Sequence, residues 1–272
     1  MQTLTDIRRI LEEHGLRPKK SLGQNFLIDH NLLRLLVDSS NVSPGDLVLE
    51  IGPGTGTLTE ELLERGASVI ACELDDQLAE ILRVRLGDQK NFTLIHGDCL
   101  ESKREFSREV VAALAGRPFR LIANLPYAAG TPALMTLLIA HPECKSMSIT
   151  IQREVADRIA SKPGTREYGA ISIIAQALTT VTKVAVAPPQ CFWPSPDVTS
   201  AMIHLQRLET PLTDDVPGLV ALCERVFAQR RKQLGSILGR DLEWPQGVSP
   251  KDRAESLDPS TMIALARVVL AR

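Results

Sequence analysis

Short aliphatic segments alternate with helix-like segments through the first two thirds of this 272-residue chain. Five of them are nearly unbroken apolar runs, as expected of strands that are buried on both faces of a sheet. These strand candidates are Leu47–Ile51, Ser68–Glu73, Phe92–His96, Phe119–Ala123 and Met147–Ile151. Repeated alternation of strands and helices predicts a parallel, doubly wound α/β sheet.

The helix-like segments between these strands have recognisable ends. Thr57–Arg65 and Asp76–Leu86 carry leucine and isoleucine at helical spacing. Gly66 and Gly87 follow them, at positions where a left-handed C-cap is expected. Both segments therefore predict helices that connect successive strands.

The pattern changes after Ala175. Thr179–Ala187 and Ala201–Arg207 predict two further strands, joined by a proline-rich segment that cannot form a regular helix. We expect an antiparallel addition at the end of the sheet, which gives a seven-stranded Rossmann-like sheet. After Glu209 the pattern is purely helical, so we predict one domain over residues 1–208 and a small all-helical domain over 209–272.

Composition narrows the possible functions. No apolar run reaches the ~18 residues of a membrane span, and the N-terminus lacks the apolar block of a signal peptide. We therefore expect a cytoplasmic protein. The five cysteines form no C-x-x-C pair, so we expect reduced, packed thiols and no metal site. The net charge of −2 counts mildly against a nucleic-acid partner.

A glycine-rich turn, residues 52–56 (GPGTG), directly follows the first strand. A ligand can approach such a backbone closely, and the next helix adds the positive end of its dipole. The spacing is not that of a dinucleotide site, because Thr57 stands where the third glycine belongs. The sequence therefore favours a nucleotide-like ligand other than a dinucleotide.

Carboxylates stand at the ends of three successive strands, at Glu50, Glu73 and Asp98. They suit S-adenosylmethionine, which is cationic and carries no phosphate. Glu73 is placed to accept both ribose hydroxyls and Asp98 to accept the adenine amine. For Asp98 alone, a solvated or helix-capping carboxylate is an equal alternative.

The most specific motif, Asn124-Leu125-Pro126-Tyr127, follows the fourth strand. An arylamine nitrogen is a poor nucleophile because its lone pair is delocalised into the ring. The side-chain oxygen of Asn124 and the main-chain carbonyl of Leu125 can accept its two hydrogens, while Pro126 stiffens the turn. Stacking of the base on Tyr127 is worth ~1–3 kcal/mol, and we expect Phe192 on the opposite face of the base. The motif predicts methyl transfer to an amino group.

Several stretches resemble the ribosomal RNA adenine dimethylases, in particular the small-subunit branch whose loss confers kasugamycin resistance. They are KSLGQNFL at 20–27, EIGPGTGTLT at 50–59, CELD at 72–75, GDC at 97–99, NLPY at 124–127, QREVADRI at 152–159, EYGAISIIAQ at 167–176, FWPSPDVTSA at 192–201, RRKQL at 230–234 and RAESL at 253–257. The resemblance covers essentially the whole chain. It implies a methyltransferase domain that dimethylates the N6 amines of two adjacent adenines in a 16S rRNA loop, on a late assembly intermediate of the small subunit.

The resemblance also implies the residues of the cofactor site. Asn25 and Leu27 cover S-adenosylmethionine, Gly52 contacts its methionine part, and Asn124 is the catalytic acceptor. The full set that we predict for the cofactor is Gln24, Asn25, Leu27, Glu50, Gly52, Gly54, Glu73, Leu74, Asp98, Cys99 and Asn124.

The chain departs from the family pattern in two places. Residues 128–130 are Ala-Ala-Gly where Asn-Ile-Ser is frequent, which is expected to loosen that loop and affect the second methylation. Gly235 replaces an arginine or lysine and removes one basic position.

Alternatives from other classes remain. The erythromycin-resistance branch shares the catalytic motif but acts on large-subunit RNA, and RRKQL and RAESL argue against it. About 60 helical residues are too few for the target-recognition domain of a DNA adenine methylase. A non-catalytic assembly factor would not need Asn124 and Tyr127, although both roles can coexist. The missing third glycine argues against a nicotinamide dehydrogenase.

RNA binding requires clustered cations despite the net negative charge. Three groups are candidates, and for each group a solvated helix face is the alternative. They are Arg225, Arg230, Arg231 and Lys232 on one predicted helix; Arg8, Arg9, Arg17, Lys19 and Lys20; and Arg153, Arg158, Lys162 and Arg166. Arg230, Arg231, Lys232 and Arg153 are the contacts that we predict with 16S rRNA in the small subunit, with a monomer as the expected state.

Overall fold

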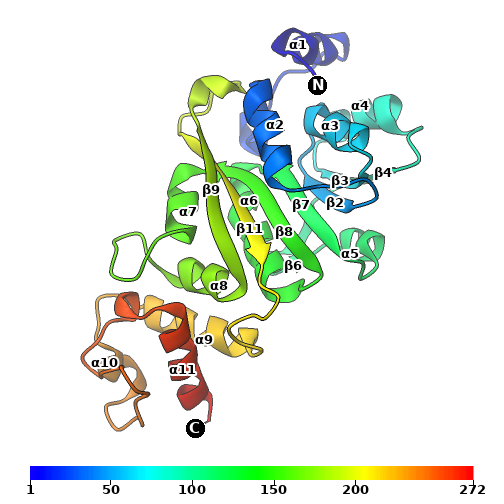
Figure 1. The fold of residues 1–272 in the computed structure, drawn as a ribbon. Helices are drawn as coiled ribbons and strands as arrows, with labels where there is room; N and C mark the ends of the chain where they lie inside the picture. Colours follow the sequence, from blue (N-terminus) through cyan, green and yellow to red (C-terminus); the bar gives the residue numbers. More distant parts are fainter. Residues whose placement is uncertain (272) are drawn as a thin grey trace. The chain divides into compact units, whose positions relative to one another are not determined.

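The chain, described here by a computed structural model of residues 1–271 except for the side chain of Ala128, contains a seven-stranded sheet (Figure 1). The strand order is β4-β3-β2-β7-β8-β11-β9. Neighbouring strands from β4 to β8 are parallel. The strands are β2 (Leu47–Ile51), β3 (Ser68–Glu73), β4 (Phe92–His96), β7 (Phe119–Asn124), β8 (Cys144–Gln152), β9 (Thr179–Ala187) and β11 (Ser200–Arg207). The sheet confirms the predicted fold class.

Burial explains which strands the sequence marks most clearly. All five residues of β2 are buried, and its register with β3 runs from Leu47 opposite Ser68 to Ile51 opposite Cys72. The edge strand β4 is only partly buried. The expectation that all five strands are buried on both faces is therefore wrong for β4, because it has a neighbour on one side only.

Helices connect the parallel strands and pack on the sheet. α3, α4 and α5 contact β3, and α2 and α6 contact β8. Their bounds are α2 (His30–Ser39), α3 (Thr57–Glu64), α4 (Asp76–Leu86), α5 (Arg108–Leu114) and α6 (Tyr127–Ala140). Gly66 has the expected left-handed backbone, with φ +80°. The same expectation for Gly87 is wrong, because this residue ends α4 in the right-handed helical region at φ −59°.

The N-terminal segment joins a second apolar cluster. α1 (Leu4–Glu13) buries Ile7, Ile10 and Leu11 against Leu78 and Ile81 of α4. The chain then passes through a 3-10 turn at Lys20–Leu22 to β1 (Phe26–Leu27). β1 pairs antiparallel with β10 (Phe192–Trp193), so two motifs far apart in the sequence share a two-stranded ribbon.

Compactness divides the chain into two units. The first contains 1–153 and 183–204, and the second contains 154–182 and the chain from 205 onward. The second unit contains one end each of β9 and β11, and nearly all of its helices lie wholly within it; α7 alone begins one residue before it. The helices are α7 (Arg153–Ile159), α8 (Ala170–Leu178), α9 (Val216–Phe227), α10 (Leu234–Leu238) and α11 (Pro259–Leu270). In it α8, α9 and α11 pack on one another, and the buried Tyr168 donates its hydroxyl to the Leu257 carbonyl at 3.0 Å. The predicted boundary at 208/209 stays a prediction, and Arg272 lies outside the described residues.

Two smaller observations concern the cysteines and the apolar character of the helices. All five cysteines are free thiols, and four of them are buried. Within residues 1–271, no helix is both long and apolar enough to cross a bilayer.

Candidate active site

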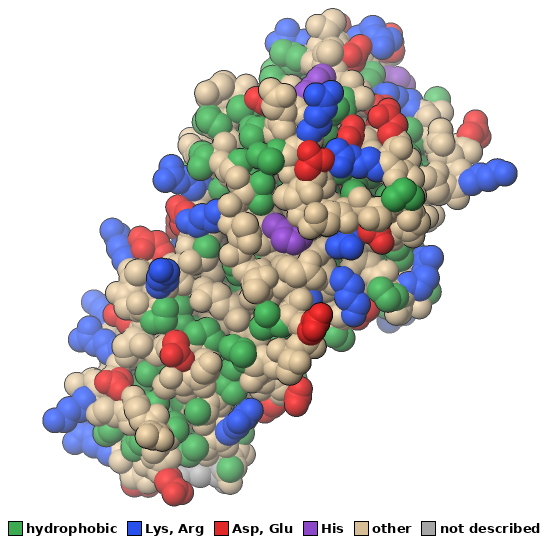
Figure 2. All heavy atoms as spheres, in the orientation of Figure 1, with side chains coloured by type: hydrophobic (Ala, Val, Ile, Leu, Met, Phe, Trp, Pro, Cys, Tyr) green, Lys and Arg blue, Asp and Glu red, His purple; other side chains and the backbone are tan. Residues whose placement is uncertain are grey.

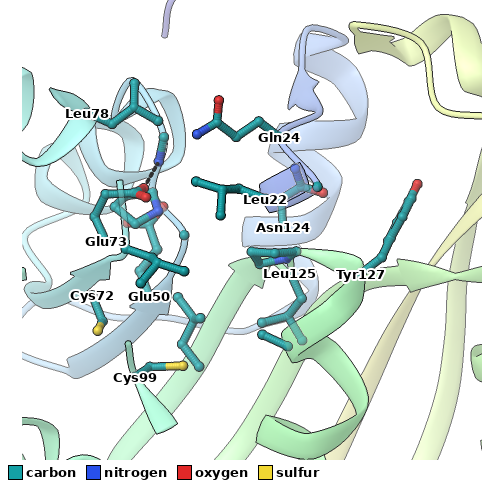
Figure 3. A pocket seen from close by; sticks show the side chains of 18 of the residues that line it. Leu22, Gln24, Glu50, Cys72, Glu73, Leu78, Cys99, Asn124, Leu125 and Tyr127 are labelled. Carbon is teal, nitrogen blue, oxygen red and sulfur yellow. Dashed lines mark hydrogen bonds between the residues drawn. The ribbon is translucent and has the colours of Figure 1, made fainter. Parts of the chain in front are cut away.

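A cavity of about 490 Å³ opens at the carboxyl ends of β2, β3, β4 and β7, where a doubly wound sheet binds its ligands. Figure 3 shows Glu50 and Glu73 on one side of it and Asn124, Leu125 and Tyr127 on the other. Every residue that we predict for the cofactor or the target base lines this cavity. They are Gln24, Asn25, Leu27, Glu50, Gly52, Gly54, Glu73, Leu74, Asp98, Cys99, Asn124, Leu125, Pro126, Tyr127 and Phe192.

The two glycines of the turn lie in close contact with side chains of two other motifs. Gly52 (φ +70°) and Gly54 (φ +63°) both adopt the left-handed backbone. A Cβ atom on Gly52 would lie 2.8 Å from Cγ of Pro126, and one on Gly54 would lie 2.8 Å from the ring of Phe26. The turn therefore fits against both the catalytic loop and the N-terminal segment, and any side chain at either glycine would push them apart.

Glu73 is held by backbone donors. Its Oε2 accepts the Gly54 N–H at 3.0 Å, drawn as the dashed line in Figure 3, and its Oε1 accepts the Asp75 N–H at 2.9 Å. The residue is 6% exposed. Burial raises the pKa of Glu73, although these backbone hydrogen bonds partly offset the effect. These two backbone donors fix the orientation of the Glu73 side chain.

Glu50 is more deeply buried, at 2% exposure. Thr59 donates its hydroxyl to Oε2 of Glu50 at 2.7 Å. Burial raises the pKa of Glu50 to about 8; the Thr59 hydrogen bond opposes this and the nearby charge of Glu73 adds to it. A ligand cation would favour the ionised form of this carboxyl group.

Asp98 and its neighbours form the side of the cavity beyond β4. Oδ1 of Asp98 accepts the Leu100 N–H at 2.9 Å. The hairpin of β5 (Leu100–Ser102) and β6 (Glu105–Phe106) follows, and residues 100–103 line the cavity. Sequence reasoning missed this hairpin, because two- and three-residue polar strands carry no clear periodicity.

Asn124 ends β7 and is oriented by the N-terminal segment. Its Nδ2 donates to the main-chain carbonyl of Asn25 at 3.0 Å. Because the amide nitrogen is held in this way, the amide oxygen is directed away from that contact. Leu125 is fixed as well, since its N–H donates to the Thr150 carbonyl of β8 at 3.1 Å.

Tyr127 begins α6, and its hydroxyl lies 2.7 Å from Oγ of Ser200. This hydrogen bond anchors the far end of the ring, which is half-buried. The Pro126 carbonyl accepts the N–H groups of Ala129 and Gly130 at 3.1 and 2.9 Å. The backbone of the divergent stretch 128–130 is thus part of a helix, while the side chain of Ala128 lies outside the described residues. Its effect on the second methylation stays a prediction.

Phe192 reaches the cavity from the β1–β10 ribbon, where it pairs with Leu27. It is 3% exposed and belongs to the apolar core that also contains Leu27 and Leu33. Its neighbour Trp193 stacks on Phe26 with ring centroids 6.2 Å apart, and the guanidinium of Arg8 lies 5.2 Å from the Trp193 ring centre. The role that we predict for Phe192 beside the target base stays a prediction.

The predicted RNA contacts lie outside the cavity lining. Arg230, Arg231 and Lys232 do not share a helix with Arg225, because α9 ends at Phe227 and they occupy the following turn. That part of the prediction is wrong, because the chain leaves the helix at Ala228, before it reaches Arg230. Arg153 begins α7, and its N–H donates to the Thr199 carbonyl at 3.0 Å.

Within the turn the three cations differ. Arg230 is half-buried: its Nε lies 2.5 Å from Oε2 of Glu255, and its Nη2 donates to the Thr165 carbonyl at 3.3 Å. Arg231 and Lys232 are exposed. Figure 2 shows Lys and Arg side chains, in blue, along the left edge of the second unit.

Gly235, the other departure from the family pattern, is buried against Pro250. A Cβ atom there would lie 2.7 Å from Cβ of Pro250 and 2.9 Å from its carbonyl oxygen. No larger side chain fits without moving the backbone. The missing cation is therefore accompanied by close packing of α10 against the turn at Pro250.

No group of three or more His, Cys, Asp or Glu side chains in the described part of the chain is arranged to hold a metal ion. The chemistry that the cavity offers consists of buried carboxylates on one side and neutral acceptors on the other.

Solved structures with a similar fold include RNA methyltransferases. A dimethyladenosine transferase from Plasmodium falciparum superposes with a TM-score of 0.73 at 24% identity, covering 88% of this chain and 95% of that chain. The 23S rRNA methyltransferase ErmE superposes with a TM-score of 0.68 at 24% identity, covering 90% and 99%. At these identities the similarity establishes the fold.

Sequence comparison is more specific. The Ribosomal RNA small subunit methyltransferase A of Phenylobacterium zucineum is 39% identical over 277 residues, which cover 100% of this chain and 95% of that protein. The protein of the same name from Mycobacterium tuberculosis is 40% identical over 268 residues, covering 94% and 81%. The family model for ribosomal RNA adenine dimethylase matches residues 15–269. The chain therefore belongs to the ribosomal RNA adenine dimethylase family.

Proposed function

We propose that this protein uses S-adenosylmethionine to dimethylate the N6 amines of two adjacent adenines in a 16S rRNA loop of the small ribosomal subunit. The observation that carries the proposal is the Asn124 side chain, held by the Asn25 carbonyl at the cavity wall across from Glu50 and Glu73. Two relatives named Ribosomal RNA small subunit methyltransferase A match 100% and 94% of this chain. We further propose that the protein acts in the cytoplasm, late in subunit assembly.

The cofactor is assigned to the side of the cavity that carries the acids. Glu73 accepts the ribose hydroxyls through lone pairs that its two backbone donors leave available, and Asp98 receives the adenine amine. Leu74 and Cys99 flank these acids, and the turn at Gly52 and Gly54 receives the methionine part. Asn25 and Leu27 of the N-terminal segment lie over the bound cofactor.

Glu50 favours a cationic ligand. Its raised pKa means that the carboxyl group holds a proton near neutral pH when no cation is near. A bound cation offsets part of the cost of ionising a buried carboxylate, so charge discriminates this ligand from neutral nucleosides.

The target base is assigned to the opposite side. When bound, S-adenosylmethionine supplies an electrophilic methyl carbon on a cationic sulfur. The Asn124 oxygen and the Leu125 carbonyl accept the two amine hydrogens, which localises the nitrogen lone pair and aims it at that carbon. These two acceptors would hold the amine neutral and oriented toward the cofactor, and the proton that the amine gives up on methylation would leave to solvent. Positioning and electrostatics thus supply most of the acceleration.

Phosphate contacts are assigned to cations outside the cavity. Arg231 and Lys232 are exposed and share one turn, whereas Arg230 beside them is paired with Glu255. Arg153 and the basic residues near the N-terminus are further candidates. Backbone contacts of this kind position the RNA without reading its sequence.

Labelled S-adenosylmethionine and small subunits that lack the modification test the proposal. The protein should transfer four methyl groups per subunit to two neighbouring adenines, and mass spectrometry of RNA fragments should locate them. Fully modified subunits are the matched control and should accept no label. Label in large-subunit RNA would instead favour the erythromycin-resistance type of activity. Tight binding to immature subunits with no transfer would favour a non-catalytic assembly factor.

A further inference from the structure

Asp75 follows the ribose acid Glu73 by two residues and caps α4. Its Oδ1 accepts the N–H groups of Gln77 and Leu78 at 3.0 and 3.3 Å. Its own N–H donates to Oε1 of Glu73 at 2.9 Å. Asp75 is 3% exposed, so one carboxylate oxygen and the backbone of this residue fix the start of α4 and the orientation of Glu73.

The second oxygen of Asp75 binds the N-terminal segment. Oδ2 accepts the Lys19 ammonium at 2.7 Å and Nε2 of Gln24 at 3.0 Å. The other end of the Gln24 amide is also engaged, because its Oε1 accepts the Lys19 N–H at 2.7 Å. Lys19, Gln24 and Asp75 thus form a closed set of hydrogen bonds, which we name the latch.

The latch closes a segment that forms one side of the cavity. Residues 21–27 line it continuously, and we call residues 19–27 the cover segment. The far end of the cover segment is held separately: Asn25 accepts from Asn124, and Phe26 and Leu27 pair with β10 and are buried in the apolar clusters. Near its start, the cover segment is held to the rest of the site through Asp75.

We infer that Asp75 is a positioning residue that fastens the cover segment over the bound cofactor and at the same time holds Glu73 in the orientation that receives the ribose. In this arrangement Gln24 acts through Asp75 rather than by touching the cofactor, and Lys19 is a latch residue rather than a phosphate contact. The inference deepens the proposed function and rests on its placement of the cofactor.

The two charged residues of the latch differ in their exposure to solvent. The Asp75 side chain is 2% exposed, while that of Lys19 is 45% exposed, so the exposed ammonium compensates the charge of the buried carboxylate. Burial would raise the pKa of Asp75, but hydrogen bonds from Lys19, Gln24 and the α4 backbone outweigh it and lower the pKa. The carboxylate therefore stays ionised and keeps both donors at working pH.

Asp75→Asn separates the latch from the helix cap. Asparagine is as good an N-cap as aspartate, so its oxygen keeps the bonds to Gln77 and Leu78. Its NH₂ group then faces the Lys19 ammonium and the Gln24 amide, where it cannot accept. We expect the cofactor Kd and KM to rise roughly tenfold, the size expected on loss of a charge-assisted hydrogen bond. The value of kcat should stay within about twofold.

Lys19→Met provides an independent route to the same state, because it removes the ammonium while Asp75 stays intact. Combined with Asp75→Asn it should add little, since both changes open one latch. Hydrogen exchange of the complete protein should report faster exchange in residues 19–27 in each variant, with α4 unchanged. Lys20→Met removes the same charge from the neighbouring residue and should leave the cofactor Kd and this exchange unchanged.

These readouts distinguish the inference from its alternatives. A loss of kcat with unchanged KM, or equal effects of Lys19→Met and Lys20→Met, would overturn the positioning role. So would unchanged exchange in the cover segment of Asp75→Asn. If the unmodified protein failed to bind S-adenosylmethionine, the proposed function would fail, whereas the exchange experiment would still decide whether the latch holds the segment.

Discussion

The two sides of the cavity are built from opposite chemistry. One side, here the acid wall, consists of the buried carboxyl groups of Glu50 and Glu73. The other, the amide wall, offers the Asn124 amide, the Leu125 carbonyl and the phenol of Tyr127. Burial raises the pKa of the phenol above its usual value, and the Ser200 hydrogen bond only partly opposes this. The acid wall can change its charge near neutral pH, and the amide wall cannot.

This difference matches two ligands of different charge. Ionising buried carboxyl groups is costly, so the acid wall is destabilising until a cation arrives. Neutral acceptors carry no charge that a ligand must balance. They suit a neutral amine, because they can accept hydrogen bonds from its two hydrogens without deprotonating it. Mutation of the amide wall should therefore abolish catalysis. Mutation of the acid wall should weaken cofactor binding and stabilise the ligand-free protein.

Asn124→Ala should have the largest effect of the changes considered. It removes the acceptor that orients the amine, so kcat should fall on the order of 10²–10³-fold or more, as for other preorganised groups at a reacting centre. The cofactor Kd should change little, because the acid wall is intact. Single-turnover transfer to unmodified small subunits measures the first quantity, and calorimetric titration with S-adenosylmethionine measures the second.

Equal losses in turnover and in cofactor affinity would break the comparison, because the amide wall would then serve the cofactor as well. The contact from Asn124 to the Asn25 carbonyl makes this a real alternative. Asn124→Asp is the matched variant: it keeps an oxygen in place but adds a charge to the wall. It too should be inactive.

Glu50→Gln should raise the stability of the ligand-free protein while it weakens cofactor binding. Glutamine keeps an acceptor for the Thr59 hydroxyl but carries no charge to desolvate. The pKa of Glu50 is about 8 in the folded protein and near 4.5 in the unfolded chain, so unfolding releases its proton between these values. The stability of the unmodified protein therefore falls as pH rises through that window, and the variant should lack this contribution to the fall.

At pH 8 the ligand-free variant is expected to be more stable by a few kcal/mol, on the order of 1.4 kcal/mol per pH unit of that window. Its cofactor Kd should rise at least tenfold. Denaturant unfolding between pH 5 and 8 measures the first effect. A variant that is no more stable than the unmodified protein at pH 8, or whose advantage does not grow with pH, would show that Glu50 is not strained in the free protein.

The sequence predicted the structure correctly where a single local pattern determines it. The bounds of β2, β3 and β9 match the prediction, because uninterrupted apolar or β-branched runs between turns leave few alternatives. The cavity residues at strand ends, Glu50, Glu73, Asp98 and Asn124, could also be predicted, since parallel strands end at one edge of the sheet. Asn25 and Leu27 could be expected there only from the family resemblance.

The rest depends on contacts between distant segments. Two-residue strands such as Phe26–Leu27 and Phe192–Trp193 carry no period, so their pairing appears only in three dimensions. The same holds for the bond from Lys19 to Asp75, where sequence suggested a phosphate ligand, and for Arg230, which Glu255 engages. A cation's partner is decided by packing, which charge patterns along the chain do not encode.

The smallest effect concerns the cations outside the two walls. The net charge of −2 provides no overall attraction for phosphate, so attraction of RNA must come from clustered cations on the surface. Replacing the exposed Arg231 and Lys232 together by glutamine should weaken subunit binding by about tenfold. It should also lower the slope of log K against log salt by roughly 0.7–0.9 for each phosphate that the variant no longer neutralises.

Arg230→Gln is the matched control in the same turn. Glu255 and the Thr165 carbonyl already engage its guanidinium, so this change should lower the unfolding temperature slightly and leave the salt slope nearly unchanged. Filter binding at several salt concentrations compares the two variants. If Arg230→Gln flattened the slope as much as the double replacement does, the pair with Glu255 would be broken on the ribosome, and burial in the free protein would no longer tell which cations bind RNA.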